Sequence, residues 1–485
     1  MSEGHPNLIG RDGVPTIGAM RRYHLTTFGC QMNAHDSERI KGMLEELGLG
    51  EAPTPAEAGI IVFNTCTIRE RPDQRLAAHL AQARALKRAD PSMVIAVGGC
   101  YAEAQRAQLF KRYPFIDVAF GPGSIPHLAD WLGAGGYGTH GRTDGETVPR
   151  GKFAEWEHFA GDLPTRRTRP FQAWVQISMG CNSRCSYCIV PSVRGPERSR
   201  KLEEIIDETC RLADDGVREV TLLGQNVNSW GRDLTSSLRH DFAELLQAVD
   251  AVPGIDRIRF TSPHPKDFRE PVIEAMASCA AVCEHTHLPA QSGSTAILKR
   301  MRRTYSRERF ISLAGRMRAR IDDLALSTDL IVGFPGETEQ DFEQTLSLVS
   351  DVGFDSAFTF VFSPRNGTEA ASLPDPVPEE VMSERIQRLV ERVQSTALEQ
   401  NKKRVGLVEN VLTEGTSRTD AAVLRGRTRR NTTVNFTGHA EPGEFVQVRI
   451  HKATSSTLGG IQIDARIAAG DERGSCLVVA DRGSG

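Results

Sequence analysis

Short hydrophobic runs and amphipathic stretches alternate along the first part of the chain. The runs have the length and composition of buried strands, and the stretches between them have a helical period. The strand runs lie at 23–28, 60–63 and 93–97, and the helical stretches at about 36–47 and 74–88. Because alternation of strands and helices is typical of a parallel sheet, we predict an N-terminal parallel α/β domain at 21–140.

The middle part of the chain repeats a strand–helix unit six times. The strands are expected at 174–177, 219–223, 257–261, 282–288, 325–332 and 357–362. Residues 338–341 have the form of a capping box before a helix that starts near Phe342. Six units are fewer than the eight of a closed barrel, so the pattern predicts an open, partial (β/α)6 barrel at 171–398.

The last part of the chain has short strands with frequent Gly and Thr. The candidate strands lie at 408–412, 422–424, 433–436 and 445–451. This pattern predicts a small C-terminal all-β barrel at 399–470, an architecture that often binds nucleic acids. We expect a linker at 141–170 and a disordered tail at 471–485, so the chain as a whole is of the α/β class.

The composition limits the class of protein. The chain has 485 residues and a net charge of −3, so any contact with nucleic acid has to come from a local basic patch. No apolar run is long enough to span a membrane, and the first residues lack the apolar core of a secretory signal. Ten cysteines in such a chain are expected to stay reduced, and clustered ones to bind metal or catalyse. We therefore expect a cytoplasmic protein.

Three cysteines lie close together after the first strand of the central domain: Cys181, Cys185 and Cys188, the loop trio. Three thiolates can ligate three irons of a [4Fe–4S] cluster and leave the fourth iron open. A structural zinc site is the alternative, but it usually has four ligands, and no second pair lies nearby. The C-x3-C-x2-C spacing resembles the signature of the radical S-adenosylmethionine (SAM) superfamily, in which SAM binds the open iron.

Three other cysteines each follow one of the predicted N-terminal strands: Cys30, Cys66 and Cys100, the strand trio. In open α/β sheets, ligands bind at the carboxyl ends of the strands, so these thiols can converge in space. We expect a second cluster site with three ligands and an open iron. Three buried core thiols are the alternative.

Polar and glycine-rich turns follow the strands of the predicted barrel. Their shared position, at the end where such barrels bind ligands, predicts that they contact SAM, although each alone is an ordinary turn. The residues are Gln225, Asn226, Gln291, Ser292, Gly333, Gly336 and Glu337.

Two groups of arginines are candidates for RNA contact. Arg166, Arg167 and Arg169 precede the central domain, as either a phosphate-contacting strap or a solvated segment. The run 425–430 contains four arginines and is expected to be a basic hairpin or loop that binds RNA phosphates. Cys210, Cys279, Cys283 and Cys476 receive no role, and His287 is expected to be a packed or hydrogen-bonded strand residue.

From about residue 23 to 463 the chain resembles the methylthiotransferase family of radical SAM enzymes, whose layout is a methylthiotransferase domain, a radical SAM core and a TRAM domain. The closest similarity is to the branch that acts on N6-isopentenyladenosine in tRNA. The segments that carry it are 29–33, 36–38, 64–70, 194–200, 222–229, 363–368 and 426–428. Ser192-Val193 and Arg71-Pro72 depart from the family pattern and put only local contacts in doubt.

The resemblance implies a radical-generating cluster on the loop trio and an auxiliary cluster on the strand trio. It implies insertion of sulfur at carbon 2 of N6-isopentenyladenosine-37 and its methylation, with SAM as methyl donor and as source of the 5′-deoxyadenosyl radical. An aromatic C–H bond is too strong for a side-chain base, so cofactor chemistry is required. The base has to leave the anticodon-loop stack, and the two trios have to face one another across it.

The resemblance also implies partners: the tRNA anticodon stem-loop and a reduced flavodoxin or ferredoxin, with the chain acting as a monomer. One alternative keeps the chemistry but changes the substrate to threonylcarbamoyladenosine in tRNA or an aspartate of a ribosomal protein. An alternative of another class is a non-catalytic RNA-binding protein with structural zinc. The identity of the electron donor, the sulfur source, the order of the steps and the oligomeric state stay open.

Overall fold

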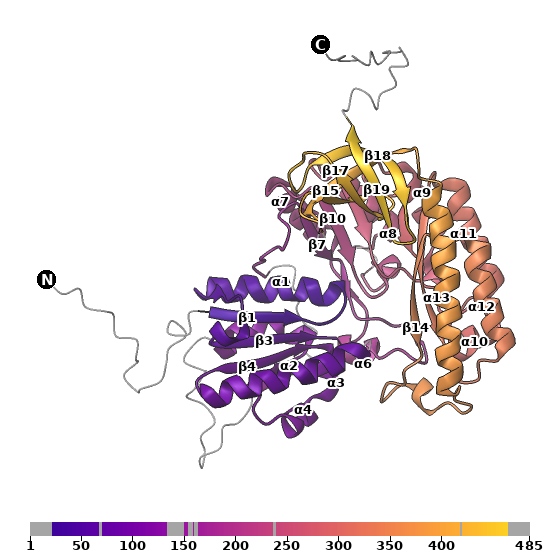
Figure 1. The fold of residues 1–485 in the computed structure, drawn as a ribbon. Coiled ribbons are helices and arrows are strands. Elements are labelled where there is room, and N and C mark those ends of the chain that lie inside the picture. Colours follow the sequence, from indigo (N-terminus) through magenta and orange to yellow (C-terminus); the bar gives the residue numbers. More distant parts are fainter. Residues whose placement is uncertain are drawn as a thin grey trace, which may run out of the picture.

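The computed structural model describes residues 22–66, 70–132, 150–153, 159, 163–235, 239–417 and 420–463. Three parts follow one another along the chain (Figure 1). The N-terminal sheet lies near one end of the central barrel, and the small C-terminal barrel lies at the other end. No helix in the described part of the chain is long and apolar enough to cross a membrane.

The N-terminal domain is a parallel sheet covered by helices, as predicted. Its strand order is β2-β1-β3-β4-β5-β6, and apolar clusters fill both faces. The strands are β1 Arg22–Thr27, β2 Gly50–Glu51, β3 Ile60–Thr65, β4 Val94–Gly99, β5 Val118–Phe120 and β6 Arg150–Lys152. The helices are α1 Gln31–Glu46, α2 Glu70–Ala89, α3 Cys100–Gln105, α4 Ala107–Arg112 and α5 Leu128–Leu132, with 3-10 turns η2 Pro55–Glu57 and η3 Pro122–His127.

Two details of this domain differ from the sequence prediction. β6 lies inside the segment 141–170 that was expected to be a linker, and it extends the sheet by pairing with β5. Helix α1 begins at Gln31, before the expected start near Asp36. Its first turns bury Asn33 and Asp36, which form hydrogen bonds to neighbouring segments, so the hydrophobic period is weak where the helix starts.

The central domain is an open barrel of six parallel strands. Two three-stranded sheets, β11-β10-β7 and β12-β13-β14, meet at a bridge between Ile258 and Val282. The strands are β7 Gln172–Gln176, β10 Glu219–Leu223, β11 Arg257–Phe260, β12 His285–His287, β13 Ala325–Val332 and β14 Ser356–Val361, with a small antiparallel pair β8 Ser178–Met179 and β9 Arg198–Ser199.

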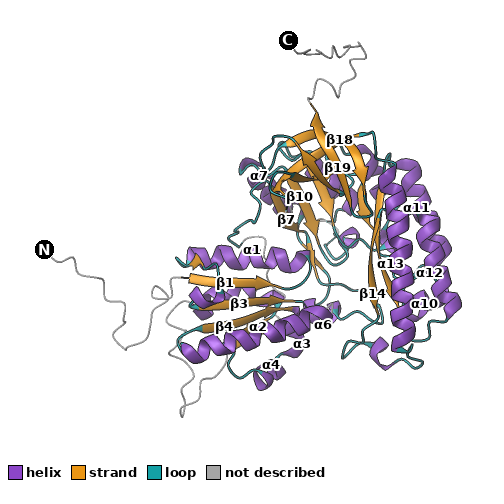
Figure 2. Ribbon diagram, viewed as in Figure 1, coloured by secondary structure: helices purple, strands orange, loops and turns teal. Residues whose placement is uncertain are grey.

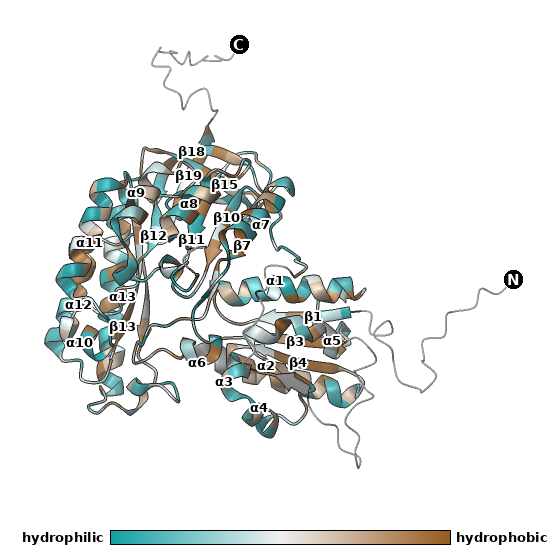
Figure 3. Ribbon diagram, turned by 180° about the vertical axis from the view of Figure 1, so that it is seen from behind, coloured by the Kyte–Doolittle hydropathy of each residue, from teal (hydrophilic) through white to brown (hydrophobic). Residues whose placement is uncertain are grey.

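Helices cover the outside of this barrel (Figure 2). Long outer helices such as α12 and α13 show both colours in Figure 3, because each has one polar and one apolar face. The expected capping box of α12 is present, with Thr338 and Asp341 bonded to each other's backbone N–H groups. The helices are α6 Val190–Arg194, α7 Leu202–Asp214, α8 Phe242–Asp250, α9 Glu270–Ser278, α10 Thr295–Arg300, α11 Arg307–Arg320, α12 Glu339–Val352 and α13 Glu379–Lys402, with 3-10 turns η5 Val227–Ser229, η6 Pro265–Asp267 and η7 Glu369–Ser372.

The C-terminal domain is a closed five-stranded barrel with strand order β15-β16-β17-β19-β18. It packs on the amino ends of the central strands: Arg257 and Arg259 of β11 donate to its backbone carbonyls, for example Arg257 Nη1 to Arg427 O at 2.8 Å. The carboxyl ends of the central strands therefore stay free for the site. The strands are β15 Val408–Thr416, β16 Leu424–Thr428, β17 Thr433–Thr437, β18 Phe445–Ala453 and β19 Thr457–Ile463.

Candidate functional site

The sheet brings the strand trio together. Cys30, Cys66 and Cys100 follow β1, β3 and β4, which are neighbours in the sheet. Cys30 precedes α1, Cys100 is the first residue of α3, and Cys66 and Cys100 are buried. A hydrogen bond between Cys30 and Cys66, against burial and together with the charge of Arg194, lowers the pKa of Cys30 to about 6, whereas burial raises the pKa of Cys100.

Two glycines allow the cysteine-bearing turns to approach one another. Gly29 has a φ of +141°, and a Cβ there would lie 2.5 Å from the Cys66 Cβ. Gly99 has a φ of +94°, and a Cβ there would lie 2.4 Å from the Thr65 carbonyl oxygen. Both positions combine a backbone conformation that favours glycine with a contact that excludes a side chain.

A buried amide pair holds these turns in place. Asn33 Nδ2 donates to Asn64 Oδ1 at 3.1 Å and to the Thr65 carbonyl at 3.2 Å. Asn64 Nδ2 donates back to the Asn33 carbonyl at 2.8 Å and to Ser37 Oγ at 3.0 Å. The start of α1 is thereby tied to the end of β3, so two trio cysteines have a fixed relative position.

The loop trio lies on the turn that β8 and β9 close by pairing. The Cys188 N–H donates to the Cys185 carbonyl at 3.1 Å, and the Ser186 N–H donates to the Met301 carbonyl at 3.1 Å. A hollow of about 550 Å³ is lined by all three cysteines and also by residues 367–369. Burial raises the pKa of Cys181, and raises that of Cys188 to about 12, so ligand binding has to displace their protons.

A buried arginine adjoins the loop trio. Arg303 Nη1 donates to Cys185 Sγ at 3.4 Å and Nη2 to the Pro289 carbonyl at 3.2 Å. Burial alone lowers the pKa of Arg303, but the neighbouring Tyr305, Tyr187 and Cys185 hold it well above its ordinary value. The carboxyl end of β12, two residues before Pro289, is thus connected to the cysteine loop.

One short segment joins the two trios. The Cys181 N–H donates to the Gly195 carbonyl at 3.1 Å. The preceding residue, Arg194, extends the other way, and its Nη2 donates to Asp36 Oδ2 of α1 at 2.9 Å. Since α6 also packs against α3, the sequence expectation that the two trios come near one another agrees with this arrangement.

Unpartnered polar atoms lie just after β10, within β13 and in the loop after β13. Gln225 Nε2, Asn226 Oδ1, Asp329 Oδ1 and Glu337 Oε1 are buried and have no hydrogen-bond partner within the described ranges. Buried polar atoms are rarely left unsatisfied, so such a group indicates a missing ligand or water. Three of these four residues belong to the predicted SAM contacts, and Gln225 also accepts a hydrogen bond from the Gly180 N–H, just before the loop trio.

The other predicted SAM contacts are engaged within the fold. Ser292 Oγ accepts from the Ser294 N–H at 3.1 Å and meets Thr345 Oγ1 of α12 at 3.4 Å. Gln291 has a φ of 68° and bridges to Leu330 through its backbone. The Gly336 N–H donates to the Asp375 carbonyl at 2.7 Å. These hydrogen bonds fix the shape of the loops after the barrel strands.

Glu337 closes the loop after β13. Its Oε2 accepts from the Gly333 N–H at 2.7 Å and pairs with Arg385 Nη1 at 3.0 Å. Burial, although opposed by these two partners, raises the pKa of Glu337 to about 7. The loop that carries both predicted glycines is therefore held by one carboxylate.

Sequence reasoning missed Asp329. It lies on β13 between Leu326 and Val332, on the strand face opposite to the residues that pack in the central core. His287 Nε2 approaches Asp329 Oδ2 at 3.3 Å, and His287 Nδ1 is 3.0 Å from Ser327 Oγ. The signal was available in part, because Ser327 and Asp329 are polar residues two positions apart in a strand with apolar ends, which indicates a polar inner face. The expectation that His287 is a hydrogen-bonded strand residue is confirmed.

The arginine run 425–430 needs a correction. Arg425 and Arg427 pair with Glu414 at 3.4 and 3.1 Å. Arg429 pairs with Glu284 at 2.7 Å, and Arg430 pairs with Asp355 at 2.5 Å. All four guanidinium groups therefore form ion pairs with carboxylates. Arg429 and Arg430 pair with acids of the central domain, so this run is first of all a domain-docking surface and not a set of unpaired positive charges.

The three arginines before the central domain also form ion pairs with carboxylates of other segments. Arg166 pairs with Glu45 of α1 at 3.1 Å, Arg167 with Asp215 beyond α7 at 3.3 Å, and Arg169 with Glu414 of β15 at 2.8 Å. Together they connect all three domains. Neither of the two sequence interpretations included this role.

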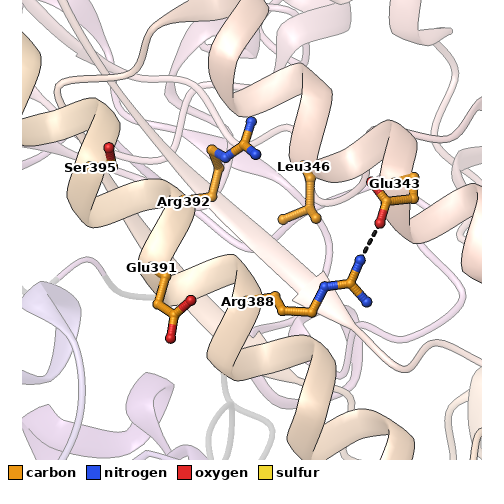
Figure 4. Close-up of a pocket in the computed structure, with 6 residues that line it drawn as sticks. All are labelled: Glu343, Leu346, Arg388, Glu391, Arg392 and Ser395. Atoms are coloured by element: carbon orange, nitrogen blue, oxygen red, sulfur yellow. Dashed lines mark hydrogen bonds and ion pairs between the residues drawn. The ribbon is translucent and has the colours of Figure 1, made fainter.

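Another surface hollow lies far from the cysteines in the sequence and in the fold. It is a groove between α12 and α13, in which Arg388 and Glu343 point toward one another in Figure 4. Arg388 bridges to Glu343 and, at 2.7 Å, to Glu339. The groove is a helix–helix contact that ion pairs hold together, and it offers no group for the chemistry of the trios.

Each trio supplies the thiol donors that a [4Fe–4S] cluster requires. Within the described ranges, no three His, Cys, Asp or Glu side chains converge as they do around one ion, and all nine described cysteines are free. Thiolates of a [4Fe–4S] cluster bind different irons, so they surround the cluster without meeting at one point. Two neighbouring groups of three thiols, each with a buried arginine beside it, match that requirement.

Three family models match successive parts of the chain. Residues 22–121 match Uncharacterized protein family UPF0004, residues 175–349 match the Radical SAM superfamily, and residues 402–462 match the TRAM domain. The radical SAM methyltransferase TsrM from Kitasatospora setae has a similar fold, with a TM-score of 0.51, 16% identity, and coverage of 72% of this chain and 75% of that one. The expected three-part α/β architecture is thus confirmed.

Relatives extend over nearly the whole length. A tRNA-2-methylthio-N(6)-dimethylallyladenosine synthase from Carboxydothermus hydrogenoformans is 45% identical over 92% of this chain and 100% of its own length. A protein of the same name from Acidothermus cellulolyticus is 45% identical over 94% of this chain and 91% of its own. On this identity and coverage, the chain belongs to the family of tRNA-2-methylthio-N(6)-dimethylallyladenosine synthases.

Proposed function

We propose that this chain is a tRNA methylthiotransferase that converts N6-isopentenyladenosine-37 to its 2-methylthio derivative. The observation that carries the proposal is the pair of cysteine trios that residues 194–195 join across the domain boundary. When bound, two [4Fe–4S] clusters and SAM supply the radical, sulfur and methyl chemistry that no side chain provides.

The residues of this chain have distinct tasks in that reaction. The loop trio would hold the radical-generating cluster, and the strand trio would hold the auxiliary cluster. Gln225 Nε2 can donate to the carboxylate of SAM, and Asp329 Oδ1 can accept from a ribose hydroxyl, because both atoms are buried without a partner in the described part of the chain. The backbone of the loop that Glu337 closes completes this edge.

The TRAM domain would hold the tRNA through residues other than the arginine run. Arg449, His451 and Lys452 of β18 are exposed, and basic residues on an exposed strand give sequence-independent phosphate affinity. Replacing Arg449 and Lys452 by Gln should weaken tRNA binding and reduce its salt dependence. Unchanged binding in this double variant would exclude β18 as the tRNA surface.

The decisive experiment is anaerobic reconstitution followed by an assay on tRNA that carries N6-isopentenyladenosine. We expect about eight irons per chain, counting two [4Fe–4S] clusters, formation of 5′-deoxyadenosine with dithionite and SAM, and the methylthio nucleoside in a tRNA digest. About one zinc per chain without SAM cleavage would support the non-catalytic alternative. If product forms only from threonylcarbamoyladenosine tRNA or only from a ribosomal protein, that molecule would take the place of N6-isopentenyladenosine as the assigned substrate.

The same proposal includes the setting of the reaction. A reduced flavodoxin or ferredoxin would donate electrons in the cytoplasm, and the chain would act as a monomer. Sedimentation of the reconstituted protein with and without tRNA tests the monomer, and a dimer in both conditions would exclude it.

A further inference from the structure

Arg194 belongs to the central domain, but its side chain contacts the N-terminal domain. It ends the short helix α6, and its ion pair with Asp36 of α1 has both side chains only 3% exposed. α6 also packs against α3, the helix that begins with Cys100. A charge is buried at such a place only when partners compensate it, so this arginine is a specific part of the domain contact.

The partners of Arg194 include the strand trio itself. The positive charge of its guanidinium acts on Cys100 and on Cys30 and lowers the pKa of each thiol, against the effect of burial. Two of the three thiols that would bind the auxiliary cluster therefore adjoin a positive charge. Because a guanidinium stays protonated at any pH that proteins tolerate, this charge is constant.

The backbone next to Arg194 determines where the charge lies. Gly195 has a φ of 74°, and its carbonyl accepts from the Cys181 N–H of the loop trio. A Cβ on Gly180 would lie 2.0 Å from the Pro196 carbonyl oxygen, so the two chain segments are in direct contact. The guanidinium can reach the strand trio only while the central domain is docked on the N-terminal domain.

We propose that Arg194 is a positioning residue for the auxiliary cluster, supplied by the opposite domain, and that docking makes this cluster easier to reduce. The proposal rests on the two-cluster assignment of the proposed function. Reduction adds one electron, here from dithionite, to a site of low dielectric constant, where a nearby positive charge favours the added negative charge. Asp36 holds the guanidinium and has the opposite electrostatic effect on the cluster.

The test is a redox titration of the reconstituted holoenzyme, in which the signals of both clusters are followed by electron paramagnetic resonance. In Arg194→Gln, the ratio of reduced to oxidised auxiliary cluster at a fixed potential should fall by about tenfold, which corresponds to about 59 mV for a one-electron couple. The radical-generating cluster serves as the internal reference and should keep its potential. An auxiliary cluster that titrates as in the parent protein would overturn the proposal.

Two further variants separate an electrostatic role from a structural one. Arg194→Lys retains the charge and should restore most of the potential. Asp36→Asn removes a negative charge and should shift the potential in the opposite direction, toward easier reduction. A shift of Asp36→Asn in the same direction as Arg194→Gln would indicate a merely structural effect and overturn the proposal. If Arg194→Gln does not retain the cluster, these two variants decide by the same titration.

A matched control comes from the same domain boundary. Arg166 also pairs with an acid of α1, Glu45, but the Arg166 side chain is 59% exposed. Arg166→Gln should therefore leave the potentials of both clusters unchanged. A shift equal to that of Arg194→Gln would overturn the proposal. If the parent protein holds only about four irons per chain, the assignment of an auxiliary cluster fails, and the inference about Arg194 fails with it. Eight irons without methylthio product would refute the proposed function, while the titration would still decide on Arg194.

Discussion

The two cysteine trios are built in opposite ways. The loop trio lies within residues 181–188 of one turn, so its three thiols are close together along the chain. The strand trio comes from the ends of three neighbouring strands and depends on the whole sheet. Substitutions that disturb the loop trio are therefore expected in or beside its own turn. The strand trio is expected to lose its geometry after any substitution that moves the end of one of its three strands.

The largest expected effect comes from removing one thiol of each trio. Cys181→Ala should abolish SAM cleavage, because the radical-generating cluster loses a ligand. Cys66→Ala should leave SAM cleavage but stop sulfur insertion, and each variant should hold about four irons instead of about eight. Product nucleosides, 5′-deoxyadenosine and iron are measured on the same sample. If Cys66→Ala also loses SAM cleavage, the trios are not independent.

The glycines beside the trios should give the next largest effect. Gly29→Ala should lower the iron content by the auxiliary cluster, because the new Cβ would lie 2.5 Å from the Cys66 Cβ. Gly180→Ala should cost the radical-generating iron, because its Cβ would lie 2.0 Å from the Pro196 carbonyl oxygen. Gly315→Ala on α11 is the control, since open space surrounds that position. Full iron content in Gly29→Ala would contradict the close approach of the strand ends.

A buried acid between α7 and α1 should affect stability rather than chemistry. Glu208 of α7 pairs with Arg39 of α1 at 2.6 Å and with Arg200 at 2.5 Å. Glu208→Gln takes a buried carboxylate from two buried guanidinium groups and should destabilise the fold by about 3 kcal/mol. Thermal unfolding measures the loss, and Glu57→Gln, which breaks an exposed pair with Arg22, should change little. Equal unfolding temperatures for both variants would contradict this assignment.

The smallest effect is expected from Arg303, the buried arginine of the loop trio. Arg303→Gln removes the contact of 3.4 Å with Cys185 Sγ and should make the radical-generating cluster a few-fold harder to reduce at a fixed potential. The auxiliary cluster should be unaffected, in contrast to Arg194→Gln. The neighbouring Arg302, which pairs with Glu369 and is 53% exposed, provides the control. A shift of the auxiliary cluster in Arg303→Gln would show that the two sites are electrically coupled.

The sequence was sufficient wherever local pattern decides the structure. The six central strands, the capping box at Thr338 and the cysteine loop follow from periodicity and spacing, because backbone geometry ties these patterns to one conformation. The strand trio was also predictable, since parallel strands end at one edge of a sheet.

Side-chain partners were not predictable in this way. The arginines of 425–430 read as free charge in the sequence, yet they pair with Glu414, Glu284 and Asp355. Ser292 was predicted as a ligand contact, yet its hydroxyl meets Thr345. Ion pairs and hydrogen bonds across domains join residues that are far apart in the chain, and no local pattern records which acid an arginine will meet.

The sequence by itself determined the two sets of three thiols, the order of the three domains and the edge of each sheet where the candidate site residues gather. The tertiary structure alone decided that Arg194 lies beside the strand trio while its neighbour Gly195 bonds to the loop trio. The physical reason is that spacing and periodicity act through the local backbone, whereas a buried charge is placed by the packing of two domains against each other.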